Sequence, residues 1–407
     1  MIGQYKGHMP LASWLKDYYR ENRQMGGGDR RIVSELLYCY YRLGHISNEL
    51  TTENRILISL FLCNQVSNPI LQYFKPLWND KVTSDLPDKL ASLSSGSGIN
   101  INLNEIFPFT KELSAGIDLT KFTSSFLNQP RPFIRIRPGM ERTIKRKLTE
   151  ANIAFRKLSD KCVELPIGTK ADLILKLDSE AVIQDYNSQK TGDFLKLLQP
   201  TQMTPTFKVL DCCAGSGGKS IMANDIFENL QLTVIDKRSS ILENLRKRFT
   251  TAGILNYRYL ASDLSKTKMN STSTLNNYNI VKAGKALLSS EPSTLIDDLF
   301  DLVICDVPCT GSGTWARSPE QLYFFNRKEL VKYSLLQKQI LENVFHSLSP
   351  GGKLLYITCS VFKAENEDNV VFMQEHLHLH LETSSLLKGY SLQADTMFVA
   401  LFTAPIN

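Results

Sequence analysis

The chain has 407 residues, 43% hydrophobic and 22% charged, which is typical of a globular protein with more than one domain. Its 47 Lys and Arg exceed its 41 Asp and Glu only slightly, so the charge permits an anionic partner without requiring one. The sequence contains no long uncharged apolar run, which argues against a membrane segment or a signal sequence. We expect a soluble, cytoplasmic monomer.

The cysteines and histidines do not form a metal-binding pattern. None of the eight cysteines forms a Cys-x-x-Cys pair, so neither a disulfide framework nor a zinc site is predicted. His376, His378 and His380 alternate with leucines and would share one face of a strand, but no carboxylate or cysteine is suitably spaced with them. We expect a solvated strand face, reduced thiols and no metal.

Residues 1–127 are predicted to form a helical domain. Apolar side chains repeat at helical spacing between Asp29, a predicted N-cap, and Gly44, a predicted stop. A second helical pattern runs from Ile56 to Phe61. The Ser- and Gly-rich stretch Ser94–Gly98 is predicted to be a loop that interrupts this domain.

Residues 128–199 are predicted to form a small α/β module. Ile134 and Ile136 alternate with arginines, as in a strand, and a short basic helix is expected from about residue 141. The densest basic patch of the chain lies here and comprises Arg131, Arg135, Arg137, Arg142, Lys145, Arg146 and Lys147. Such a patch can neutralise phosphates, although a solvated helix face would have the same composition.

Residues 200–407 alternate between strand and helix patterns, which predicts an α/β domain with a doubly wound, mainly parallel sheet. The expected strands are 207–211, 232–236, 259–263, 300–306 and 353–359. A stretch rich in Ser, Thr and Asn, residues 265–294, is predicted to be an inserted loop without an assigned function.

A glycine-rich turn follows the first of these strands and is predicted to bind a nucleotide-like cofactor. A P-loop is disfavoured because Cys213 stands where its first glycine should be, and the dinucleotide fingerprint fails at Ser220. A purely structural tight turn is the alternative. The residues expected to contact the cofactor are Cys213, Ala214, Gly215, Ser216, Gly217, Gly218 and Lys219.

Three aspartates end three successive strands, and in an open parallel sheet all of them can face one crevice. Asp236 is placed to accept hydrogen bonds from both hydroxyls of a ribose, and Asp263 is placed to hold an adenine amino group. Asp306 ends the third strand and is also expected to contact the cofactor. A single aspartate at a strand end is more often a turn or cap residue, but three after a glycine-rich turn favour a binding site.

Two cysteines follow strands in the segments 306–320 (DVPCTGSGTWARSPE) and 356–368 (YITCSVFKAENED). Cys309 comes after Asp-Val-Pro, and Cys359 stands between Thr and Ser. A zinc deaminase would need a second cysteine where Ser312 stands, so that chemistry is unsupported.

Together with the turn CAGSGGKS, these segments resemble the motifs of the Sun-type RNA cytosine-5 methyltransferases. The resemblance spans about residues 130 to 407, and the N-terminal helices are loosely similar to the NusB-like domain of bacterial members. It implies a Rossmann-like catalytic domain that uses S-adenosylmethionine. The chain departs from the family pattern at Gly215-Ser216, where Ala-Pro is usual.

The resemblance also implies roles for the residues that match. Carbon 5 of cytosine is a poor nucleophile, so a thiolate must first add to carbon 6. The family assigns this attack to the cysteine of the Thr-Cys-Ser segment, hence Cys359, although related DNA enzymes use the cysteine after proline. Cys309 would then promote release, and Asp306 would share a proton with nitrogen 3.

The predicted partner is RNA, with ribosomal RNA of the 16S type favoured by the extra N-terminal helices. The alternatives are a transfer RNA cytosine-5 methyltransferase and a non-catalytic RNA-binding or ribosome-assembly factor on the same fold. The target cytosine must leave its stack, so Trp315 is a candidate stacking partner, or else a core residue.

Overall fold

The computed structural model describes residues 1–46, 50–198, 206–267, 269, 279–288 and 299–406. The described chain divides into two units, of which the first comprises Met1–Pro130 and Ser312–Arg327. The second comprises Arg131–Gly311 and Lys328–Asn407. This division differs from the predicted one because the small basic module joins the catalytic sheet, and the segment after Cys309 joins the helices.

The first unit is helical. Its α-helices are α1 (Leu11–Glu21), α2 (Gly27–Arg42), α3 (Thr52–Cys63), α4 (Pro69–Phe74), α5 (Pro76–Asn79), α6 (Leu86–Ser97), α7 (Leu119–Ser125) and α12 (Pro319–Phe324). The N-cap of α2 is Gly26, and Asp29 lies one turn inside, where its carboxylate accepts from the Gly26 amide at 3.0 Å. The N-cap therefore lies three residues before the predicted one. Asp29 is the third residue of the helix, and its side chain bonds back to the N-cap amide, as in a capping box.

Helix α6 continues through the predicted loop at Ser94–Gly98. The Ser95 and Ser97 hydroxyls donate to the carbonyl oxygens of Ala91 and Leu93 at 2.8 Å, so these serines bond within the helix. Gly98 then ends the helix with φ of 64°, a left-handed conformation that glycine adopts readily. The Ser/Gly composition marked the end of a helix and not an interruption.

The segment Ser312–Arg327 contributes to the core of the helical unit. Trp315 is 1% exposed, and its ring centroid lies 4.8 Å from that of Phe325 and 6.0 Å from that of Phe107. Nη1 of Arg42 donates at 2.9 Å to the carbonyl oxygens of Phe126, Asn128 and Ala316. Trp315 is therefore a core residue, and the alternative of a stacking partner for a base is wrong.

The second unit begins with a small sheet of order β2-β3-β1-β4 in the described residues. Its strands are β1 (Phe133–Ile136), β2 (Arg156–Ser159), β3 (Cys162–Glu164) and β4 (Ala181–Ile183), and α8 (Glu141–Glu150) packs on it. Ile144 and Leu148 of α8 are buried against Ile134 and Ile136 of β1. The strand and the basic helix predicted for this module are both present.

The larger sheet of this unit has the order β12-β13-β11-β10-β5-β6-β7-β8-β9 within the described residues. Its strands are β5 (Phe207–Asp211), β6 (Leu230–Asp236), β7 (Tyr257–Ala261), β8 (Asn279–Lys282), β9 (Lys285–Leu288), β10 (Phe300–Asp306), β11 (Leu348–Thr358), β12 (His380–Leu387) and β13 (Met397–Thr403). The pairs from β11 through β7 are parallel, and the edge pairs are antiparallel. All five predicted strands fall on this sheet.

Two of the smaller predictions differ from this sheet. The predicted loop 265–294 contains the hairpin of β8 and β9, which extends the sheet beyond β7, while residues 268, 270–278 and 289–298 lie outside the described residues. The three histidines do not share a strand face, because His376 is the C-cap of helix α14 (Glu367–Glu375) and β12 begins only at His380.

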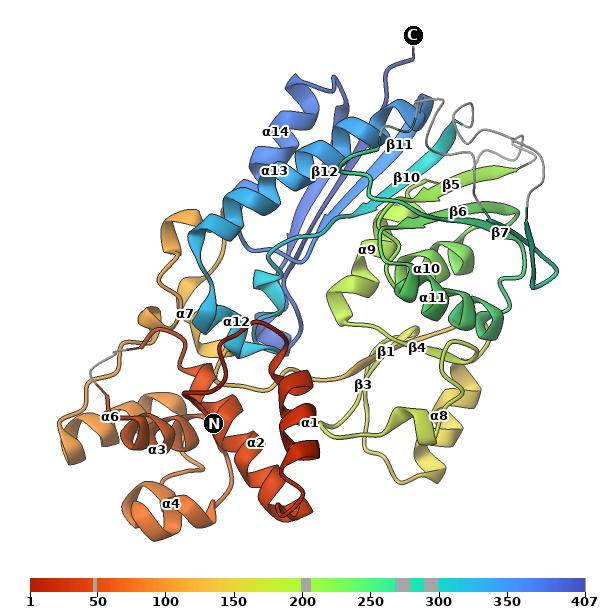
Figure 1. Cartoon of the computed structure of the whole chain (residues 1–407). Helices are drawn as coiled ribbons and strands as arrows, with labels where there is room; N and C mark the ends of the chain where they lie inside the picture. The colour runs from red at the N-terminus through yellow and green to blue at the C-terminus, as the bar shows by residue number, and fades with distance from the viewer. Residues whose placement is uncertain (47–49, 199–205, 268, 270–278, 289–298, 407) are drawn as a thin grey trace. The chain divides into compact units, whose positions relative to one another are not determined.

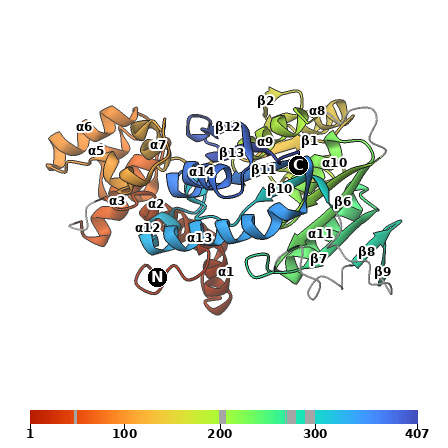
Figure 2. The same ribbon diagram turned by 90° about the horizontal axis from the view of Figure 1, so that it is seen from above.

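Helices cover both faces of the large sheet (Figures 1 and 2). Helices α13 (Arg327–Val344) and α14 (Glu367–Glu375) contribute to one apolar core, and α9 (Tyr186–Lys196), α10 (Gly218–Ile226) and α11 (Ser239–Ala252) contribute to the other. The chain runs from β5 to β6 and β7 in one direction, and then returns to β10 and β11 on the other side. This reversal between β5 and β10 is where open α/β sheets bind ligands.

Candidate active site

The glycine-rich turn connects β5 to α10 at the switch point. Gly215 has φ of 53° and Gly217 has φ of 85°, conformations that side-chain-bearing residues rarely adopt. A Cβ on Gly217 would lie 2.6 Å from the Phe249 ring, whereas a Cβ on Gly215 or Gly218 would meet nothing within 4 Å. Gly217 thus permits close packing on α11, and the other two glycines border open space.

The end of β5 also holds a buried carboxylate that was not predicted. Asp211 is fully buried, and its Oδ2 accepts from Ser220 Oγ at 2.6 Å. Burial raises the pKa of Asp211 to about 7, although the Ser220 hydrogen bond lowers it. The bond ties the strand to the first turn of α10, behind the glycines.

Asp236 is the predicted ribose ligand, and its carboxylate faces the glycine turn. Its Oδ2 accepts from the Gly215 amide at 2.9 Å, and its Oδ1 accepts from the Arg238 amide and Nε at 2.9 and 3.0 Å. The Arg238 guanidinium on this carboxylate is half-exposed. Asp263 lies two residues beyond β7, where Oδ1 accepts from Ser265 Oγ at 2.6 Å.

A cavity of about 360 Å³ opens at the switch point. Its lining includes five residues of the turn, followed by Lys219, Asp306 and Cys359. Several further lining residues come from the connection between β4 and α9, from α9 and α11, and from the loop before β13; they include Gln184, Asp185, Ser188, Arg248 and Asp395. None of them was predicted individually as a site residue, because they converge only in the folded chain.

Lys219 lines this cavity together with Asp306 and Cys359. Its Nζ is 3.0 Å from Asp306 Oδ2 and donates to Ser188 Oγ at 2.7 Å. Burial lowers the pKa of Lys219, but the attraction of Asp306, Cys359 and Asp211 outweighs burial, so the pKa is raised overall. Lys219 therefore remains protonated beside the two groups predicted to act on the base.

The two predicted cysteines lie next to each other. Strands β10 and β11 pair in parallel, with Asp306 opposite Ile357, so the loops after both strands begin at the same edge. The Cys359 amide donates to Cys309 Sγ at 3.3 Å. A hydrogen bond with the Cys309 thiol, followed by burial, raises the pKa of Cys359 well above its usual range, whereas Lys219 lowers it.

The predicted basic patch separates into buried and exposed parts. Arg135 and Arg137 form buried ion pairs with Asp225 of α10, and Arg137 Nε lies 3.0 Å from that carboxylate. These two arginines therefore hold the small sheet to the larger one and do not belong to a phosphate-binding surface. Their burial follows from the alternation of β1, which turns both side chains toward α10.

The remaining patch residues are more accessible. Lys147 pairs with Glu180 at 2.7 Å, and Arg131 Nε donates to Gln393 Oε1 at 2.8 Å. Arg142, Lys145 and Arg146 are exposed on α8.

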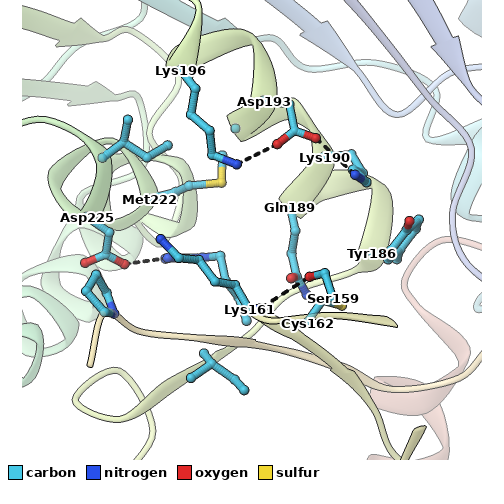
Figure 3. Close-up of a pocket in the computed structure, with 15 residues that line it drawn as sticks. Ser159, Lys161, Cys162, Tyr186, Gln189, Lys190, Asp193, Lys196, Met222 and Asp225 are labelled. Carbon is cyan, nitrogen blue, oxygen red and sulfur yellow. Dashed lines mark hydrogen bonds and ion pairs between the residues drawn. The ribbon is translucent and has the colours of Figure 1, made fainter. Parts of the chain in front are cut away.

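A second cavity, of about 80 Å³, lies beside Asp225 (Figure 3). There Asp193 accepts from both Lys190 and Lys196, so these lysines are already paired.

The described residues meet neither the requirements for a metal site nor those for a membrane-spanning helix. In the part of the chain that the structure describes, no group of three His, Cys, Asp or Glu side chains is arranged to hold a metal ion. None of the described helices combines the length and the apolar character needed to cross a membrane.

Comparison with known proteins places residues 196–402 in a family. A model described as 16S rRNA methyltransferase RsmB/F matches residues 196–402. Ribosomal RNA small subunit methyltransferase B of Xanthomonas campestris is 30% identical over 194 residues, which cover 47% of this chain and 38% of that protein. The tRNA (cytosine(72)-C(5))-methyltransferase NSUN6 of Mus musculus is 28% identical over 170 residues, covering 41% and 32%. The matches thus span only about a third of the length of these relatives.

A solved structure supports the fold. The crystal structure of NSun6 from Pyrococcus horikoshii with SFG aligns with a TM-score of 0.55 at 13% identity, covering 74% of this chain and 97% of that chain. At this identity the likeness concerns the fold alone. It confirms the predicted Rossmann-like methyltransferase architecture.

Proposed function

The chain belongs to the 16S rRNA methyltransferase RsmB/F family, and from this premise we propose that it methylates carbon 5 of a cytosine in ribosomal RNA. The observation that carries the proposal is the convergence of Cys359, Asp306 and Lys219 on the cavity beside the glycine turn. Cys309 adjoins this group through the Cys359 amide. Covalent cytosine methylation requires a thiol that adds to carbon 6, a carboxyl group that shares a proton with nitrogen 3 and a second group that takes the carbon 5 proton.

The protein uses S-adenosylmethionine, as the family does. The residues of the turn fit this cofactor, because Gly215 and Gly218 border open space at the cavity and Asp236 presents a carboxylate beside them. When bound, the cofactor supplies an electrophilic methyl group. Asp236 would hold the ribose and Asp263 the adenine amino group, while Gly215, Ser216 and Gly218 would approach with backbone atoms.

The reaction starts with Cys359. Its thiolate adds to carbon 6 of the cytosine, and a sulfur–carbon bond forms while electron density moves toward nitrogen 3 and carbon 5. Asp306 passes the proton that the Cys359 thiol loses on to nitrogen 3, and Lys219 holds the Asp306 carboxylate in place through the 3.0 Å ion pair. Carbon 5 is then nucleophilic enough to accept the methyl group.

Cys309 completes the cycle. After methylation, the carbon 5 proton leaves toward Cys309, and its electron pair forms the double bond between carbons 5 and 6 as the Cys359 sulfur departs. Cys359 is the better attacking residue because it lines the cavity together with Asp306 and Lys219. The Cys359 amide lies 3.3 Å from Cys309 Sγ. This proximity is consistent with Cys309 acting as a second thiol on the same ring.

Methyl transfer to bulk RNA tests the proposed function. Purified protein, S-adenosylmethionine and undermethylated total RNA should yield 5-methylcytidine in a nucleoside digest, and bisulfite sequencing should map it to small-subunit ribosomal RNA. A map to transfer RNA instead would support the substrate in the name of the mouse relative. Binding of RNA without any methylated product would favour an assembly factor on the same fold.

A further inference from the structure

A buried carboxylate joins the two cysteine loops. Glu365 lies at the end of the short helix Lys363–Glu365 and is fully buried. Its Oε1 accepts from the Thr310 amide at 2.9 Å, and its Oε2 accepts from the Thr310 hydroxyl at 2.6 Å. Oε2 also accepts from the Ser360 hydroxyl. Thr310 directly follows Cys309 and Ser360 directly follows Cys359, so one side chain bonds to both loops.

The orientation of this carboxylate is itself fixed. Gln337 Nε2 donates to Glu365 Oε1 and to the Pro308 carbonyl oxygen, both at 2.9 Å. Gln337 Oε1 accepts in turn from Asn369 Nδ2 at 2.7 Å. The network therefore also holds the Val-Pro-Cys turn from the side of α13.

A carboxylate satisfies every group in this network. Two N–H donors point at Oε1 and two hydroxyls point at Oε2, so an ionised Glu365 can accept from all four. Burial is the largest effect and raises the pKa of Glu365 above its usual value, although the hydrogen bonds from Ser360, Thr310 and Gln337 oppose the rise. Burying a carboxyl group is costly, so its hydrogen bonds to both cysteine loops indicate a role beyond filling the core.

We propose that Glu365 is a positioning residue that fixes the separation of the Cys309 and Cys359 thiols, so that both can act on one base. This inference rests on the proposed function of the site. The thiols must act on adjacent ring carbons in succession, so a small loosening of either loop should slow the chemical step more than it weakens binding. Glu365 touches neither substrate nor cofactor in this account.

The first test does not depend on the RNA. Diamide takes up the hydrogens of two neighbouring thiols as they form a disulfide, so its rate of Cys309–Cys359 cross-linking, measured by mass spectrometry, reports their proximity. Wild-type protein should cross-link readily, and Glu365→Gln should slow the reaction by about tenfold or more. Equal rates, or no cross-link in the wild type, would overturn the proposal.

Matched variants distinguish an effect on the positions of the two thiols from an effect on the stability of the fold. Thr310→Ser keeps both donors and should behave as wild type, whereas Thr310→Val loses the hydroxyl and should cross-link more slowly. Met373→Ala removes a fully buried side chain from α14 without bonding to either loop, so it should lower the melting temperature and leave cross-linking unchanged. Slowing by Met373→Ala equal to that by Glu365→Gln would reduce Glu365 to a merely structural residue.

Turnover provides the second test. Glu365→Gln should lower kcat by about a hundredfold while leaving the KM for RNA and the affinity for S-adenosylmethionine unchanged. A rise in KM at constant kcat would contradict the proposal. If the wild type methylates no RNA, the proposed function fails, and the cross-linking result still decides the role of Glu365.

Discussion

The Cys359 thiol lies between two neighbours with opposite effects on its ionisation. The hydrogen bond with Cys309 raises its pKa, and the ammonium of Lys219 lowers it. In the free protein the first effect and burial dominate, so the thiol is protonated at neutral pH. The attacking thiolate is therefore expected only once the site is occupied and the proton has a place to go.

The pH dependence of alkylation tests this arrangement. The rate at which iodoacetamide modifies Cys359 should rise with pH. The midpoint of this rise should lie above the pKa of an ordinary thiol, which is about 8.5. Cys309→Ala should move the midpoint to lower pH because it removes the hydrogen bond that raises the pKa, and Lys219→Met should move it higher. Peptide mapping of the alkylated residue at each pH measures both shifts. Unchanged midpoints would show that neither neighbour controls the thiol.

The residues of the site differed in how far the sequence could predict them. Cys309, Cys359 and Asp306 follow strands within distinctive motifs, and the structure brings them to one edge of the sheet. Lys219 was expected at the cofactor; it lines the cavity beside the glycine turn and also pairs with Asp306. Glu365 and Asp211 were not assigned because their roles depend on burial and on contacts between distant segments, which no local spacing reveals.

At the scale of elements, the ion pairs of Asp225 connect β1 to α10. The carboxylate lies between the guanidinium groups of Arg135 and Arg137, and the side chains of all three residues are largely buried. Asp225→Ala should lower the free energy of unfolding by about 3 to 5 kcal/mol, because two buried cations lose their partner. Urea unfolding measures the loss. Glu150→Ala, which breaks an exposed pair on α8, is the control and should have little effect.

The exposed face of α8 is the remaining candidate for phosphate binding. Reversing the charges of Arg142, Lys145 and Arg146 should weaken RNA binding and flatten its salt dependence, by about one unit of slope for each phosphate that the helix no longer neutralises. Filter binding at several salt concentrations measures the slope. Lys332→Glu, an exposed charge on α13, should leave it unchanged. An equal loss of cofactor affinity would contradict this assignment.

Elements with a clear apolar period were predictable, and those that depend on local bonding were not. The five parallel strands and α8 follow directly from their patterns. The end of α6 was misread because serines that bond back to their own helix have the composition of a loop. The hairpin of β8 and β9 was missed because its flanking Ser- and Asn-rich residues dominate the composition there.

At the scale of the whole molecule, the chain returns from the catalytic sheet to the helical unit directly after Gly311. The sequence composition could not predict that residues 312–327 belong to the helical unit, because this segment directly continues the motif around Cys309. Its aromatic side chains instead complete a core that residues 1–130 begin. The helical unit is therefore built partly from the motif that carries one of the two cysteines.

Trp315→Ala tests the dependence of the helical unit on this segment. The variant should lose about 3 to 5 kcal/mol of stability, the usual result of removing a large buried aromatic side chain. Cofactor affinity should remain, because the glycine turn belongs to the other unit. Tyr73→Ala, which truncates an exposed aromatic residue of the same helical unit, should change little. Unaltered melting of the Trp315 variant would contradict the assigned core.

The covalent step is the central claim, and trapping its adduct tests it most directly. Each cysteine variant is incubated with target RNA and S-adenosylmethionine, and protein–RNA adducts are resolved on a denaturing gel. Cys309→Ala should accumulate an adduct, because attack by Cys359 proceeds while release fails. Cys359→Ala should form none. An adduct with Cys359→Ala and none with Cys309→Ala would contradict the assignment.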